Sequence, residues 1–268
     1  MILRRITDAF RRQDWFTVAV ETLIVILGVF LGIQLGNWNQ YAGDRRSETE
    51  YLRQLQGDLH NIQAEVDAQI EFEQFQANMA GEVYTLIRDD ASEDRALKID
   101  TGLSQLLVRR TLRTQSPTFL NLQGSGRLEI ISDPDLRAAI ISYFYSTDRL
   151  AAAIDKNNAT FIDGAFVDFM MSEGIPPRGW DNGLMNKKLP AGQVSSAFKE
   201  KVWENPLYAA GGAGLDAPPD AEIWEKVVPR LAWRGNISTN NESLAQSLKT
   251  ATEELETELD RRLERHAP

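Results

Sequence analysis

The chain has 268 residues, 43% of them hydrophobic and 25% charged, which is typical of a folded globular protein rather than a disordered one. It has no cysteine and only two histidines, His60 and His266, so disulfides and thiolate chemistry are excluded and a histidine-based zinc site is disfavoured. The formal net charge of −10 disfavours nucleic acid as a partner, because phosphate backbones are bound by clustered Lys and Arg. We expect no cofactor, no metal and no catalytic constellation.

The first 15 residues form a basic stub with four arginines, and residues 16–37 follow as an apolar segment whose only charge is Glu21. A helix of this length rises about 30 Å, enough to cross the hydrocarbon core of a lipid bilayer. Trp15 and Trp38 flank the segment at positions typical of the aromatic belts at membrane interfaces. Because arginines before a span favour a cytoplasmic N-terminus, we predict a single-pass signal-anchor in the cell inner membrane, with the bulk of the chain periplasmic.

Two other interpretations of this segment compete with the anchor. Residues 23–35 have the length of a signal-peptide core, but no A-x-A-like cleavage site follows, and bulky Trp38 and Tyr41 stand where small residues are needed. A buried helix of a soluble protein fits poorly, because the apolar residues cover all faces of the helix. The anchor therefore explains the pattern best.

Three glycines in the apolar segment are spaced four residues apart, at Gly28, Gly32 and Gly36. Small residues at this spacing let two helix backbones approach closely in lipid, and Gln34 is able to add a hydrogen bond between helices. We expect self-association or another membrane protein as a partner. The alternative is that glycine is simply common in transmembrane helices.

Glu21 lies about one turn inside the predicted span. Ionisable residues within a membrane are costly and often functional, so Glu21 is a candidate intramembrane acid. The alternative is that its carboxylate reaches water or accepts an arginine of a partner.

Residues 44–268 are predicted to form one extracytoplasmic helical domain after a short polar hinge at 41–46. Apolar residues recur there at intervals of three and four, which is the heptad pattern of a coiled coil: Leu52, Leu55, Leu59, Ile62 and Val66. A final helix is expected from about Glu242, with a second apolar series: Leu244, Leu248, Leu255, Leu259 and Leu263. Antiparallel pairing of these two helices is the simplest way to bury both series. The predicted fold is therefore all-α, with one N-terminal transmembrane helix and an extracytoplasmic helical bundle.

The middle of the chain predicts further helices and one irregular region. A helix is expected over 101–114, and Ser116-Pro117 and Asp133-Pro134 are helix start signals. Residues 174–235 are rich in Pro, Gly and Trp and are predicted to be an irregular insertion. Four tryptophans of this insertion either line a ligand groove or form a loop-rich core, and we favour the core: Trp180, Trp203, Trp224 and Trp233.

A group of arginines, Arg109, Arg110 and Arg113, stands out in the acidic domain. Arginine binds carboxylates and phosphates through a bidentate fork, so this group is a candidate anion site. The competing interpretation, which we favour, is ion pairing with Asp and Glu on neighbouring helices.

Three short motifs suggest serine hydrolase chemistry: residues 196–199 match S-x-x-K, 238–240 match S-x-N and 249–251 approximate K-T-G. The last motif lies in an expected helix, has alanine in place of glycine, and lacks the strand that such enzymes need. An envelope hydrolase with an atypical site is therefore only a second alternative.

The stretch from Glu21 to Tyr51, with Asn37-Trp38-Asn39 at the end of the apolar segment, resembles an uncharacterised family of bacterial single-pass inner-membrane proteins. A weaker resemblance covers residues 124–146. The resemblance implies the membrane topology and no chemistry. We expect a membrane-tethered helical interaction or sensory module of the bacterial envelope, with a structural or accessory subunit of a membrane complex as the first alternative.

Overall fold

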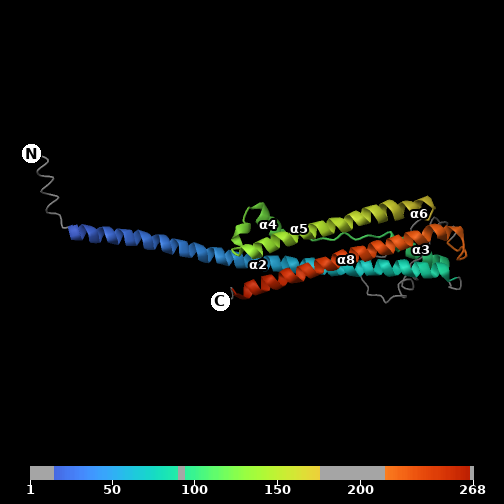
Figure 1. Ribbon diagram of the computed structural model, residues 1–268, viewed down its shortest axis with the longest axis horizontal. Helices are drawn as coiled ribbons and strands as arrows, with labels where there is room; N and C mark the ends of the chain where they lie inside the picture. Colours follow the sequence, from blue (N-terminus) through green and yellow to red (C-terminus); the bar gives the residue numbers. More distant parts are fainter. Residues whose placement is uncertain (1–14, 90–93, 176–214, 266–268) are drawn as a thin grey trace, which may run out of the picture. The chain divides into compact units, whose positions relative to one another are not determined.

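Figure 1 shows the computed structural model of the chain, which describes residues 15–89, 94–175 and 215–265. These ranges are mostly helical and contain no strand, so the all-α prediction is confirmed for them. The chain divides into two units, with the boundary after Leu52. The helix α2 covers Trp15–Arg88 and contributes to both units.

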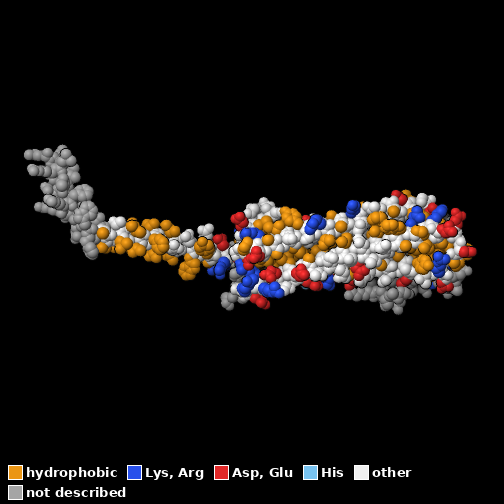
Figure 2. Space-filling model, viewed as in Figure 1, with side chains coloured by type: hydrophobic (Ala, Val, Ile, Leu, Met, Phe, Trp, Pro, Cys, Tyr) orange, Lys and Arg blue, Asp and Glu red, His pale blue; other side chains and the backbone are white. Residues whose placement is uncertain are grey.

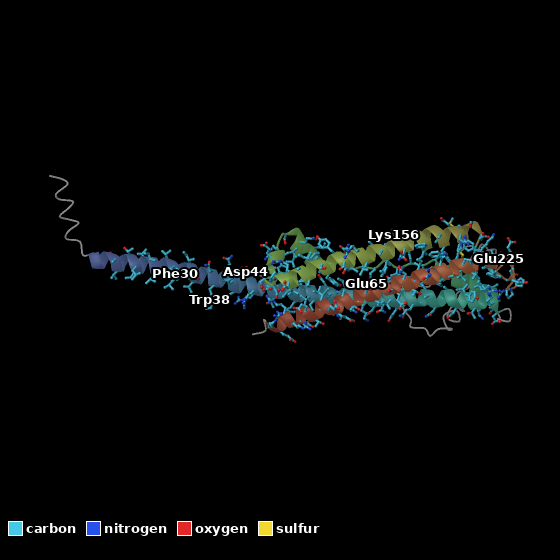
Figure 3. All side chains as sticks on the ribbon, in the orientation of Figure 1. Phe30, Trp38, Asp44, Glu65, Lys156 and Glu225 are labelled. Atoms are coloured by element: carbon cyan, nitrogen blue, oxygen red, sulfur yellow. The ribbon has the colours of Figure 1, made fainter. Side chains whose placement is uncertain are left out.

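The first unit contains an apolar stretch of α2 that is long enough to cross a membrane, and none of it is buried. Its large described side chains are exposed, from Val20 at 37% to Trp38 at 72%. Figure 2 shows hydrophobic side chains covering this part of α2, and Figure 3 shows Phe30 and Trp38 extending outward from it. Such a surface is stable only in lipid or against another apolar surface.

The polar hinge expected at 41–46 is helical in the structure. The segment has no proline, and its single glycine, Gly43, costs a helix only about 1 kcal/mol relative to alanine. Thr49 donates a hydrogen bond from its hydroxyl back to the Arg45 carbonyl at 2.9 Å. Local chemistry thus favours continuing the helix here.

In the second unit, α2 and the C-terminal helix α8 (Glu222–Arg265) lie antiparallel. Three contacts share one register, because each step up in residue number along α2 is matched by an equal step down along α8. The pairs are Gln56 with Asp260, Asp67 with Lys249, and Gln74 with Glu242. The four leucines expected at this interface are buried: Leu55, Leu59, Leu255 and Leu259. The predicted antiparallel pairing is confirmed.

The helix α8 begins at Glu222 rather than near residue 242, so the irregular region predicted for 174–235 ends earlier than expected. Its buried positions continue at intervals of three and four from Trp224 to Leu259. Several are polar, notably Arg234, Ser238 and Asn241, and Pro229 lies inside the helix. These residues obscured the periodicity in the sequence.

A third helical stretch consists of α5 (Pro134–Asn157), the π-helix η2 (Asn158–Val167) and α6 (Asp168–Ser172). Asp133 caps α5 by accepting hydrogen bonds from two backbone amides, with Pro134 in the first turn, as the start signal predicted. The helix α5 packs on α8, where the Tyr143 and Thr252 hydroxyls lie 2.8 Å apart.

Two shorter helices and a 3₁₀ turn complete the described elements: α3 (Arg95–Leu106), α4 (Pro117–Gly124) and η1 (Leu128–Ile130). Gly102 of α3 faces α2, where a Cβ atom would overlap the Val83 side chain, so only glycine permits this approach. Ser116 caps α4 as expected, by accepting a hydrogen bond from the Phe119 amide.

The helix predicted over 101–114 ends at Leu106, and residues 108–116 have no regular secondary structure. Burial alternates along this connection: Leu112, Thr114 and Ser116 are buried, whereas Thr111 and Arg113 are exposed. A period of two is typical of an extended chain, which β-branched residues such as threonine favour. Figure 1 shows the connection running lengthwise along α5.

Candidate functional site

The connection 108–116 forms part of a groove with a volume of about 780 Å³. Its other walls are α2, through Asn61, Ile62 and Glu65, and α5, through residues 148–155. Pockets that bind ligands in proteins have volumes of about 300–1,000 Å³, so the groove is large enough for one. We therefore take it as the candidate functional site.

The groove contains charged side chains that no described residue neutralises. Asp148 and Asp155 lie seven residues apart, and so on one face of α5, and Arg113 lies opposite on the connection. None of the three forms an ion pair with another described residue. Asp155 Oδ1 is buried and accepts no hydrogen bond within the described ranges. These groups are available to a ligand.

The backbone of the connection is also unpaired. Among the described residues, no amide from 109 to 115 donates a hydrogen bond. Of the carbonyl groups in the same stretch, the one of Arg110 accepts a bond, from Asn158 Nδ2 at 3.1 Å. Backbone amides require a partner, either water or another molecule. The connection thus presents a row of donors and acceptors.

A layer of buried polar side chains from α2, α8 and η2 holds the connection in place. Glu73 Oε1 accepts hydrogen bonds from Gln69 Nε2 at 2.8 Å and from Asn241 Nδ2 at 3.1 Å. The same Asn241 amide donates to Asn158 Oδ1 at 3.1 Å, which joins α2, α8 and η2. Because Asn158 also holds Arg110, this network reaches the connection directly.

Arg234 of α8 anchors the start of the connection. Its guanidinium donates from Nε to the Leu106 carbonyl at 2.9 Å and from Nη2 to the Val108 carbonyl at 3.1 Å, and it also contacts Ser238. A cation at these carbonyls satisfies the C-terminal end of α3, which explains why that helix ends there. Arg234 is only 1% exposed.

Burial dominates the electrostatics of this layer. Desolvation lowers the pKa of Arg234 to about 10, although the negative charge of Glu73 acts in the opposite direction. Burial raises the pKa of Glu73, whereas the Arg234 charge and the neighbouring Asn241, Ser238 and Gln69 lower it. The Ser238 hydroxyl lies close enough to favour the charged form of Glu73. It does not make a hydrogen bond of good geometry, however, and Glu73 Oε2 accepts none from any described residue. Both charged forms are therefore held in an unfavourable environment.

The three arginines of the predicted anion site do not converge. Arg109 pairs with Asp163 at 3.0 Å and Arg110 pairs with Glu65 at 2.7 Å. Arg113 alone lines the groove. Two of the three thus pair with carboxylates, and the anion site stays a prediction.

The other predicted positions lie in the first unit. Glu21 and Gln34 are exposed, and Gly28, Gly32 and Gly36 have no atom within 4 Å of a Cβ built on them. Trp15 begins α2, but its side chain lies outside the described part. The structure therefore leaves the glycine positions accessible to a partner helix.

The tryptophans and the hydrolase motifs do not form a common site in the described residues. Trp224 is buried, whereas Trp233 is 58% exposed and stacks on Phe161 with ring centroids 5.4 Å apart. Ser238 is buried beside Arg234, and Lys249 pairs with Asp67 at 2.7 Å. Trp180, Trp203 and residues 196–199 lie outside the described ranges.

Neither the groove nor the polar layer was predicted from the sequence. A signal for the layer exists, because polar residues occupy three buried positions of α2 that are spaced four and three residues apart: Gln69, Glu73 and Gln76. The groove has no such signal, since its three walls come from distant parts of the chain. The chain matches no protein-family model, no curated protein and no solved structure.

Proposed function

We propose that the protein is a single-pass inner-membrane protein of the bacterial envelope whose helical unit binds a partner or ligand outside the cytoplasm. The observation that carries this proposal is the apolar stretch of α2, which is unburied and long enough to cross a membrane. The four arginines before it favour a cytoplasmic N-terminus. The groove of the second unit, with its uncompensated charges, supplies the binding surface.

Reporter fusions to the full chain test the topology. We expect alkaline phosphatase fused after residue 268 to be active, and a green fluorescent protein fused there to be dark when exported through the general secretion route. A matched variant, Leu27→Arg, places a charge at the centre of the span and costs about 3 kcal/mol of insertion free energy, so it should reduce the phosphatase signal. Fluorescence from the wild-type fusion, or release of the protein by alkaline carbonate, would contradict the proposal.

The glycine series offers a surface for self-association within the membrane. Successive glycines four residues apart drift by only about 40° around the helix, so all three share one face. Gly32→Ile should weaken association of the span, because a bulky side chain holds a partner helix away. Phe30→Ile is the control, since Phe30 lies about 160° around the helix from Gly32. A two-hybrid assay in a bacterial inner membrane measures both, and equal signals for all three spans would show that the helix serves only as an anchor.

A further inference from the structure

We propose that the groove binds an extended peptide segment of a partner protein, and that this segment carries basic side chains. This inference rests on the proposed function, because it names the class of ligand that the helical unit would bind. Three observations support it: the backbone amides of the connection and the carboxylates of α5 have no partner among the described residues, and the side chains that line the groove are of a suitable kind.

The backbone of the connection suits an extended peptide. An extended chain presents amides and carbonyls alternately, so a second extended chain beside it can pair with them as an added strand does. Exposed side chains alternate with buried ones from 111 to 116, and the amides of 109–115 donate no hydrogen bond to any described residue. A peptide would replace the water that these groups otherwise bind.

The carboxylates of α5 determine the charge of the segment. Asp148 and Asp155 stand seven residues apart, or about 10 Å along a helix. Basic side chains on one face of an extended peptide stand about 7 Å apart at alternate residues and about 14 Å at every fourth residue. The flexible stem of lysine or arginine is long enough to make up the difference between these spacings and the separation of the two carboxylates. Arg113 opposite them is able to bind a peptide carbonyl or carboxylate.

The lining favours a peptide over a compact organic ligand. Small-molecule pockets are mostly lined by aromatic and large apolar side chains. None of the described residues that line this groove is aromatic, and its α5 wall presents Ala151 and Ala152 between the two carboxylates. Small side chains there leave room for a peptide backbone to approach the helix.

The probe for the test is a library of displayed heptapeptides of random sequence, selected on the full chain in detergent or nanodiscs. We expect enrichment of Lys and Arg at alternate or every-fourth positions. The double variant Asp148→Asn and Asp155→Asn keeps the shape of the groove. It should lower the affinity for enriched peptides about tenfold, because two charge pairs are lost. Asp220→Asn with Glu225→Gln neutralises two exposed acids that do not line the groove and should change nothing.

A second measurement separates strand pairing from charge attraction. N-methylation of alternate amides in an enriched peptide should abolish binding for one alternating set and not for the other, because one set faces the connection. Hydrogen exchange of the amides at 109–115 should slow when the peptide is bound. Equal effects of both sets, or unchanged exchange, would overturn the inference.

The outcomes distinguish this inference from the proposed function. Enrichment of acidic or uncharged peptides that depend on Thr111 or Arg113 would overturn the basic-peptide inference and keep the groove as a binding site. Absence of any groove-dependent enrichment would overturn the groove itself and leave the membrane topology to be decided by the fusions.

Discussion

The pair of helices α2 and α8 has two stretches that share one spacing and differ in chemistry. In one stretch Leu55 and Leu59 are buried on α2, and Leu255 and Leu259 on α8. In the other, the same spacing buries Gln69, Glu73 and Gln76, and Glu73 interacts with Asn241 and with the charge of Arg234 on α8. Apolar contacts are not directional, so the leucine stretch stabilises the pair without fixing one alignment. The polar stretch makes hydrogen bonds between defined partners, such as Asn241 with Glu73, and these form only in this register. It is therefore a determinant of alignment, as buried polar residues are in coiled coils.

The largest expected effect is in the polar stretch. Arg234→Met should lower the free energy of unfolding by about 3–5 kcal/mol, because Glu73 is left buried without its compensating charge. The double variant with Glu73→Leu should lose much less than the sum of the two single variants, because no buried charge remains. Chemical unfolding of the full chain in detergent, followed by tryptophan fluorescence, measures this. Strict additivity would show that the two charges are not coupled.

The leucine stretch should respond to the loss of volume. Leu259→Ala should lower the free energy of unfolding by about 2–4 kcal/mol, because a fully buried side chain is replaced by a cavity. Leu263→Ala, one turn further along α8, serves as a control, since Leu263 is only half-buried and should lose less. Similar losses for both leucines would show that burial does not distinguish them.

The smallest expected effect is a pH dependence that only the polar stretch has. Because burial raises the pKa of Glu73 above 4.5, the folded protein binds this proton more tightly than the unfolded chain. The contribution of Glu73 to stability is thus full below about pH 4.5 and is lost as pH rises through the folded pKa. The difference in unfolding free energy between wild type and Glu73→Gln should fall as pH rises from 4 to 7. A difference that rises over this interval would mean that the Arg234 charge outweighs burial.

The parts of the fold that local chemistry determines could be predicted from the sequence. Ser116 and Asp133 cap the helices that follow them, and the leucine spacing predicted which faces of α2 and α8 pair. The end of α3 could not be predicted in this way. It depends on Arg234, which is more than a hundred residues away in sequence, and a helical pattern across residues 101–114 gives no sign of that bond.

The candidate site was harder to predict for the same reason. Asp148 and Asp155 are ordinary surface residues in the sequence. They matter because they line one groove with the connection, whose amides at 109–115 have no hydrogen-bond partner among the described residues. The arginines at 109 and 110 drew attention by their spacing, yet both are paired with acids. These individual residues were therefore less informative than the backbone of the connection, whose amides have no partner among the described residues.

The antiparallel register of α2 and α8 has a consequence for biosynthesis. The contacts that hold these helices together join residues 168 to 204 positions apart, so the partner of Glu73 leaves the ribosome long after Glu73 itself. Until α8 is translated, α2 presents a half-finished surface that mixes leucines with polar groups in need of partners. Contacts this distant slow folding and expose nascent chains to aggregation. A chain truncated before Glu222 should therefore be degraded rapidly in cells, even though every residue of α2, α3 and α5 is present.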